Sequence, residues 1–159
     1  MELNTQNEFN VILNKCYDLV IQNMKESGLI KKWDGEYTNI TAEKHFENIV
    51  QWCKDNIKSK TWSYNTSSKD GFSTSYGAKH KCERKLKCYV ANNWMKLAMI
   101  FSGLEVCNRD CVVNKRPVLF QEILTNKVNF ICRRTSNEPY EIKYNCLFNY
   151  EPEELKYIC

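Results

Sequence analysis

The sequence predicts an α+β fold in a single domain, residues 1–159, with an antiparallel sheet, two N-terminal helices and one buried central helix. Three observations predict it. A length of 159 residues suits one domain. Apolar residues recur at helical spacing in three segments, about 5–27, 41–57 and 92–102. Short apolar or alternating runs bounded by turn residues lie mainly in 60–90 and 112–150, which predicts strands there.

The composition is that of a globular protein. Hydrophobic residues make up 43% and charged residues 26% of the chain, with only five Gly and three Pro, so collagen-like and low-complexity disordered classes are excluded. The N-terminal residues lack the pattern of a secretory signal, and no apolar run is long enough to span a membrane. We therefore expect an intracellular protein of the cytoplasm or nucleus with no membrane partner. The oligomeric state is not predicted.

The first predicted helix begins at Thr5, where the spacing of Thr5 and Glu8 fits a capping box. Its apolar stripe consists of Phe9, Ile12, Leu13, Cys16, Val20 and Met24. Gly28 can adopt the left-handed conformation that ends a helix.

The second predicted helix begins near Thr41. Its apolar face consists of Phe46, Ile49, Val50, Cys53 and Ile57. Nine cysteines are an odd number and none form a Cys-x-x-Cys pair, which favours reduced thiols. We expect Cys16 and Cys53, each on an apolar stripe, to be buried as reduced thiols.

The segment from Lys79 to Val90 is the most informative. Apolar and charged residues alternate along it, which predicts a half-buried strand with a row of lysines on one face. Successive lysines would lie about 6.7 Å apart, close to the spacing of phosphates along a nucleic-acid strand. The predicted nucleic-acid-binding residues are Lys79, Lys81, Arg84, Lys85 and Lys87. The alternative is a solvated face whose lysines discourage pairing between sheet edges.

The charge distribution supports an anion-binding surface at this place. Ten Lys or Arg and three Asp or Glu lie between Lys54 and Lys96, a net charge of +7 against −3 for the rest of the chain. A local basic excess of this kind is typical of surfaces that meet nucleic acid.

Four cysteines form a candidate zinc site, the only cofactor that the sequence suggests. They are Cys82, Cys88, Cys107 and Cys111, spaced as Cys-x5-Cys and Cys-x3-Cys. On one continuous strand Cys82 and Cys88 would lie about 20 Å apart, too far to share an ion. The site therefore requires a hairpin turning at Arg84 and Lys85, where the residues that favour such turns are missing.

The central helix is apolar nearly all round, which predicts burial. Asn92 or Asn93 is the expected N-cap and Gly103 the expected stop. Further strands are expected at 112–113 and 118–120. A closing antiparallel hairpin is expected between 128–133 and 140–148, followed by a short helix after Pro152.

No catalytic motif is present, so a non-enzymatic binding function is predicted, with nucleic acid as the first choice of partner. A protein-interaction or regulatory module is the alternative, in which Trp33, Trp62 or Tyr64 would anchor a protein partner. A metal-dependent nuclease is a remote alternative. Its residues would be Glu141 and Lys143 on one strand face, with Asp110 as a second metal ligand.

Overall fold

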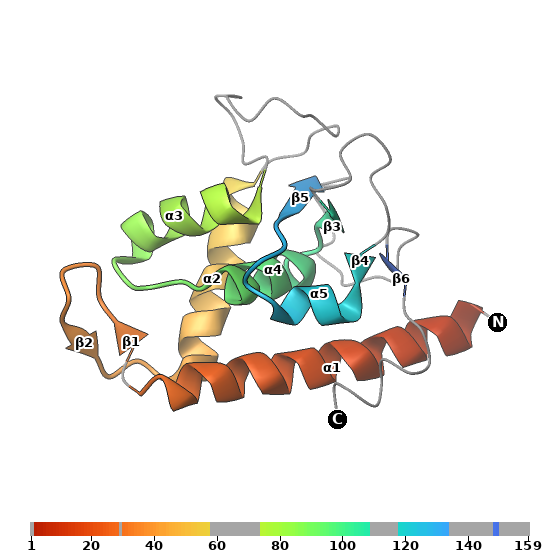
Figure 1. Cartoon of the computed structure of the whole chain (residues 1–159), viewed down its shortest axis with the longest axis horizontal. Helices are drawn as coiled ribbons and strands as arrows, with labels where there is room; N and C mark the ends of the chain where they lie inside the picture. The colour runs from red at the N-terminus through yellow and green to blue at the C-terminus, as the bar shows by residue number, and fades with distance from the viewer. Residues whose placement is uncertain (1, 29, 58–73, 109–117, 134–147, 150–159) are drawn as a thin grey trace.

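The computed structural model describes residues 2–28, 30–57, 74–108, 118–133 and 148–149. This part of the chain is mostly helical and broadly α+β (Figure 1). The helices are α1 (Glu2–Glu26), α2 (Ala42–Asn56), α3 (Ser75–Leu86), α4 (Asn92–Phe101) and α5 (Phe120–Leu124). The strands are β1 (Ile30–Lys31), β2 (Tyr37–Thr38), β3 (Glu105–Asn108), β4 (Val118–Leu119), β5 (Phe130–Arg133) and β6 (Phe148–Asn149).

The three predicted helices are confirmed as α1, α2 and α4. α1 starts at Glu2, so Thr5 lies inside the helix and is not its first residue. The end of α1 agrees with the prediction, because Gly28 has a φ of +82° and its N–H donates to the carbonyl of Lys25 at 3.0 Å. Thr41 caps α2 by accepting a 3.1 Å hydrogen bond from the N–H of Lys44.

α4 is the centre of the core, as predicted. It contacts α1, α2, α3, α5 and β3, and every residue from Val90 to Ile100 is buried. Cys16 of α1 and Cys53 of α2 are buried as expected, and the Cys53 thiol lies 3.6 Å from the sulfur of Met95 in α4. The long α1 runs along one side of this arrangement and packs against α2, α4 and α5 (Figure 1).

The ends of α4 are satisfied in two different ways. At its C-terminus the N–H of Gly103 donates to the carbonyl of Ile100, and the N–H of Leu104 donates to the carbonyl of Met99. These two bonds form a Schellman motif, in which Gly103 has a φ of +88°. At its N-terminus neither Asn92 nor Asn93 is the cap. Instead the side chain of Asn126, in the turn before β5, accepts a 3.0 Å hydrogen bond from the N–H of Asn93.

α4 also carries a fully buried lysine. The ammonium of Lys96 donates to the carbonyl oxygens of Glu122 and Val128 and lies 4.7 Å from the ring centroid of Phe130. Burial lowers the pKa of Lys96 to about 7, from an ordinary value of 10.5. This cation therefore belongs to the core and takes no part in the basic surface.

The strand predicted at 79–90 is wrong, because residues 75–86 form the helix α3. Thr74 is its N-cap and accepts a 3.0 Å hydrogen bond from the N–H of Gly77. Five residues of α3 are buried at helical spacing: Ser75, Ala78, Lys79, Cys82 and Glu83. Two of the five, Lys79 and Glu83, are charged. A pattern based on apolar residues alone therefore misses the helical period of the buried face and shows the two-residue period of a strand.

The described strands form three short pairs where the sequence predicted one antiparallel sheet. β1 and β2 form an antiparallel hairpin that was not predicted. β5 confirms a strand within 128–133 and pairs antiparallel with β3. A pairing of β5 with 140–147 stays a prediction, because those residues lie outside the described part of the chain. Strand β4 pairs with β6 in parallel. Residues 60–64, 112–113, 140–147 and the segment after Pro152 lie outside the described residues.

None of the described helices is long and apolar enough to cross a membrane.

Candidate nucleic-acid interface

The predicted basic residues divide between the two sides of α3. Lys81, Arg84, Lys85 and Lys87 are exposed, whereas Lys79 is only 8% exposed. On a helix Lys81 has Arg84 and Lys85 as neighbours, three and four residues on. The structure therefore brings four of the five residues to the solvent side and corrects the prediction for Lys79. We call Lys81, Arg84, Lys85 and Lys87 the α3 basic face.

Lys79 is part of a buried polar cluster. Its ammonium donates to Glu83 Oε1 at 3.2 Å and to the carbonyl of Val90 at 3.2 Å, and it lies over the rings of Tyr76 and Tyr89. Glu83 is 3% exposed, accepts a further hydrogen bond from the N–H of Val90 and lies 3.1 Å from His80 Nδ1. Lys79 is thus fully engaged inside the protein and is not available to a phosphate.

The C-terminal end of α3 is not a standard helix stop. Lys87 is the C-cap and adopts the left-handed conformation at a φ of +57°, which is unfavourable for a residue with a Cβ atom. The positive charges of Arg84, Lys85 and Lys87 lie near the carbonyl end of the helix dipole, which favours cations there. Within the described part of the chain, none of these three side chains forms an ion pair.

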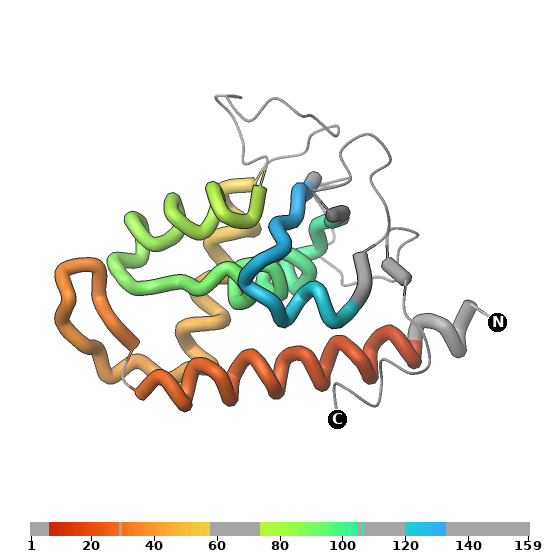
Figure 2. Tube along the Cα trace, viewed as in Figure 1, coloured from red at the N-terminus to blue at the C-terminus, as the bar shows by residue number. Residues whose placement is uncertain are grey.

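The β1–β2 hairpin docks on the chain directly after α3. The N–H of Trp33 donates to the carbonyl of Lys87 at 2.8 Å, and the N–H of Tyr89 donates to the carbonyl of Lys31 at 2.7 Å. Between them Lys32 and Cys88 form an antiparallel bridge. Figure 2 shows the hairpin beside the segment that leads from α3 to α4. Two segments far apart in sequence are thereby held in a fixed register.

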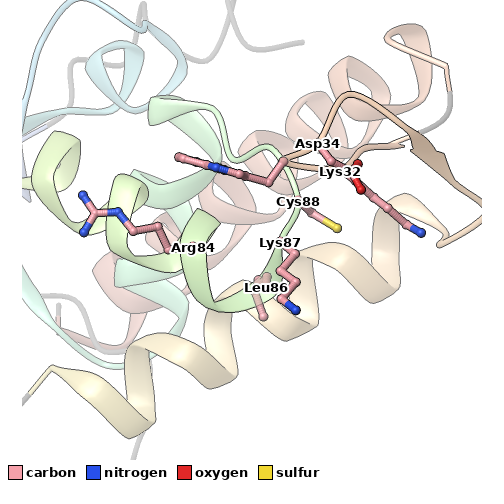
Figure 3. A pocket seen from close by; sticks show the side chains of 7 residues that line it. Lys32, Asp34, Arg84, Leu86, Lys87 and Cys88 are labelled. Atoms are coloured by element: carbon pink, nitrogen blue, oxygen red, sulfur yellow. The ribbon is translucent and has the colours of Figure 1, made fainter.

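This docking creates a pocket of about 520 Å³ between the hairpin and the end of α3 (Figure 3). We call it the hairpin pocket. It is lined by Lys32, Trp33, Asp34, Arg84, Leu86, Lys87 and Cys88. Three of these side chains are cationic and one is a carboxylate, so the lining carries a net positive charge. Burial raises the pKa of the Cys88 thiol, which is therefore neutral near pH 7.

The turn of the hairpin fixes the residues that it presents to the pocket. Gly35 has a φ of +93°, and its N–H donates to the carbonyl of Lys32 at 3.0 Å. The carboxylate of Asp34 accepts a 3.1 Å hydrogen bond from the N–H of Glu36. The Asp34-Gly35 pair is a strong turn signal in the sequence and could have revealed this hairpin.

The four predicted zinc ligands are not placed as the hairpin at Arg84 and Lys85 would require, because α3 runs through that position. Cys82 faces the core, and burial raises the pKa of its thiol to about 12, which disfavours the thiolate that zinc binds. Cys88 lines the hairpin pocket and Cys107 belongs to β3, while Cys111 lies outside the described residues. No group of three or more His, Cys, Asp or Glu in the described segments is placed to hold a metal ion. A site that includes Cys111 stays a prediction.

The residues of the remaining alternatives lie mostly outside the described part of the chain. These are Trp62 and Tyr64 for a protein partner, and Asp110, Glu141 and Lys143 for a nuclease. Trp33 is described and is 56% exposed.

Comparison of the chain with protein-family models, with curated proteins and with solved structures finds no match.

Proposed function

We propose that this protein binds nucleic acid through the phosphate backbone, and that the α3 basic face makes the contacts. The observation that carries the proposal is the exposure of Lys81, Arg84, Lys85 and Lys87, which lie in the C-terminal half of α3 and at its C-cap. Lysine and arginine side chains grouped in this way neutralise neighbouring phosphates and release condensed counterions. Contacts to phosphate carry no sequence information, so we expect little sequence preference.

The separation of the core cations from the surface supports this proposal. Lys79 and Lys96 are buried and have partners within the protein. The α3 basic face is exposed, and Lys32 of the docked hairpin, which pairs with Glu36 at 4.0 Å, lines the adjoining pocket. The proposed contact surface therefore lies along the C-terminal half of α3 and the turn that follows it.

The test replaces Lys81, Arg84 and Lys85 together by glutamine and measures affinity for DNA and RNA over a range of salt concentrations. If three phosphate contacts are lost, the slope of log affinity against log salt should shrink by about 2.7 for duplex DNA and about 2.1 for single strands. The triple variant should remain folded because the three side chains are exposed. The matched control replaces Lys44 and Lys127, two exposed lysines outside this surface, and should leave the slope unchanged. An unchanged slope in the triple variant, or no binding by the native protein at low salt, would overturn the proposal.

One observation favours a protein partner as a second candidate. Trp33 is exposed, and tryptophan is enriched among the residues that dominate protein interfaces. Association with a protein through such an anchor would depend weakly on salt, and the glutamine triple variant would leave it intact.

A further inference from the structure

The hairpin pocket is lined by cationic side chains and by apolar ones, of which one is aromatic. Lys32, Arg84 and Lys87 supply positive charge, while Trp33, Leu86 and Cys88 supply apolar surface. Figure 3 shows Arg84 and Lys87 from the α3 side, and Lys32 and Asp34 from the hairpin side. A volume of about 520 Å³ falls within the range of roughly 300–1,000 Å³ typical of small-ligand sites. The pocket is therefore large enough for a planar group together with its charged substituent.

Trp33 is exceptional among the described tryptophans. It is 56% exposed, whereas Trp52 and Trp94 are 6% and 3% exposed. Its backbone is held on one side by the hydrogen bond to Lys87 and on the other by the Asp34-Gly35 turn. Because the backbone is already ordered, a ligand that stacks on the indole does not have to fix it first.

We propose that the hairpin pocket binds an unpaired nucleotide, with its base stacked on Trp33 and its flanking phosphates bound by Arg84 and Lys87. This inference rests on the proposed function and names its substrate class, single-stranded nucleic acid. Basic grooves with aromatic platforms are the general means by which proteins bind single strands without sequence preference. In a duplex both faces of each base are covered by neighbouring bases, and exposing one costs a few kcal/mol. Trp33 therefore favours the single strand.

The position of Lys87 connects the two parts of the surface. It belongs to the α3 basic face and it lines the hairpin pocket, and its carbonyl oxygen accepts the hydrogen bond from Trp33. A strand whose phosphates follow Lys81, Arg84 and Lys87 would thus reach the indole at the end of the helix. The base that stacks on Trp33 is then the one between the phosphates bound by Arg84 and Lys87.

The experiment compares Trp33→Ala and Trp33→Phe with the native protein. The probes are labelled oligothymidylate, the matching oligouridylate and a DNA duplex of the same length. Trp33→Ala should bind the single strands about tenfold more weakly or worse, the loss of one base–aromatic stack, and should bind the duplex as the native protein does. Trp33→Phe should retain much of the affinity. Tyr37→Ala removes another exposed aromatic of the same hairpin, outside the pocket lining, and should have no effect.

The outcomes separate this inference from the proposed function. If Trp33→Ala binds single strands as tightly as the native protein while the glutamine triple variant changes the salt slope, the stacking role is wrong and phosphate binding stands. Equal affinity of the native protein for duplex and single strand would also overturn the inference. If the triple variant leaves the salt slope unchanged, phosphate binding by the α3 basic face is wrong, and the inference that rests on it falls with it. The two oligonucleotides show whether the single strand is DNA, RNA or either.

Discussion

Lys79 and Glu83 form an ion pair of 3.2 Å that is almost entirely buried, with 10% and 4% of the two side chains exposed. The pair lies one helical turn apart on the core side of α3. The same carboxylate also accepts a hydrogen bond from the N–H of Val90, in the segment between α3 and α4. Glu83 therefore joins α3 to the start of α4 as well as neutralising Lys79.

We expect Glu83→Ala to destabilise the protein by about 3–5 kcal/mol, because it leaves a buried ammonium and a buried N–H without their partner. Urea unfolding measures this change. Replacing Lys79 and Glu83 together by methionine should recover part of the loss, since no charge then stays buried. Lys44 and Glu47 form an exposed pair on α2, and Glu47→Ala is the matched control with a change of about 0.5 kcal/mol or less. A loss below about 1 kcal/mol in Glu83→Ala would contradict the importance of the buried pair.

The buried Lys96 predicts that stability rises with pH above neutrality. Burial lowers its folded-state pKa to about 7 from 10.5, so between these values the unfolded chain binds more protons than the folded protein. The free energy of unfolding should therefore increase from pH 7 to pH 9, by at most about 1.4 kcal/mol per pH unit. Above pH 9 the buried Cys82 opposes this trend, because its pKa is raised to about 12 and the thiol ionises first in the unfolded chain.

Lys96→Met isolates the contribution of the lysine. Urea unfolding of the variant at a series of pH values should give a flatter profile between pH 7 and pH 9, because methionine does not titrate. A rise in stability that persists unchanged in the variant would assign the pH dependence to other groups.

Lys87 predicts opposite effects on stability and binding. Its left-handed conformation costs about 1–2 kcal/mol for a residue with a Cβ atom, and glycine avoids that cost. Lys87→Gly should therefore raise the free energy of unfolding by about 0.5–1 kcal/mol once the greater freedom of the unfolded chain is included. The same variant should bind single-stranded nucleic acid more weakly, with a salt slope smaller by about 0.7.

Unfolding in urea and binding over a salt series measure the two effects on one preparation. Lys85→Gly, two residues earlier and within α3, is the control for glycine itself and should lower stability by about 1 kcal/mol. A loss of stability in Lys87→Gly as large as that in Lys85→Gly would show that Lys87 is not strained.

The sequence predicts the helices well where apolar residues alone form the buried face. α1, α2 and α4 meet this condition. α3 does not, because the charged residues Lys79 and Glu83 occupy core positions and the remaining residues alternate with a period of two. A charged pair four residues apart is itself a helical signal, and it would have favoured the correct element. The strand pairings of β3 with β5 and of β4 with β6 depend on contacts between distant segments, which periodicity does not contain.

The sequence predicts most residues of the candidate site, but it does not predict how they are arranged in space. Arg84, Lys85 and Lys87 are recognisable as a basic cluster in the sequence, and Trp33 as a candidate anchor. That Trp33 and Lys87 share one pocket follows from a backbone hydrogen bond between residues more than fifty positions apart. Lys79 is the buried lysine of the cluster because Glu83, the carbonyl of Val90 and the rings of Tyr76 and Tyr89 surround its ammonium, and this arrangement depends on how the chain folds after α3.

The cap of α4 has a consequence for the order in which the protein assembles. The N–H of Asn93 is satisfied by the side chain of Asn126, which is 33 residues further along the chain. During synthesis from the N-terminus, α4 emerges before its own cap exists, although every other helix in the core packs against it. The central helix can therefore begin to collapse onto α1 and α2 early, but its first turn is completed only after the segment through Asn126 has folded back. The first turn of α4 therefore reaches its native hydrogen bonding only after α5 and the turn that follows it have folded.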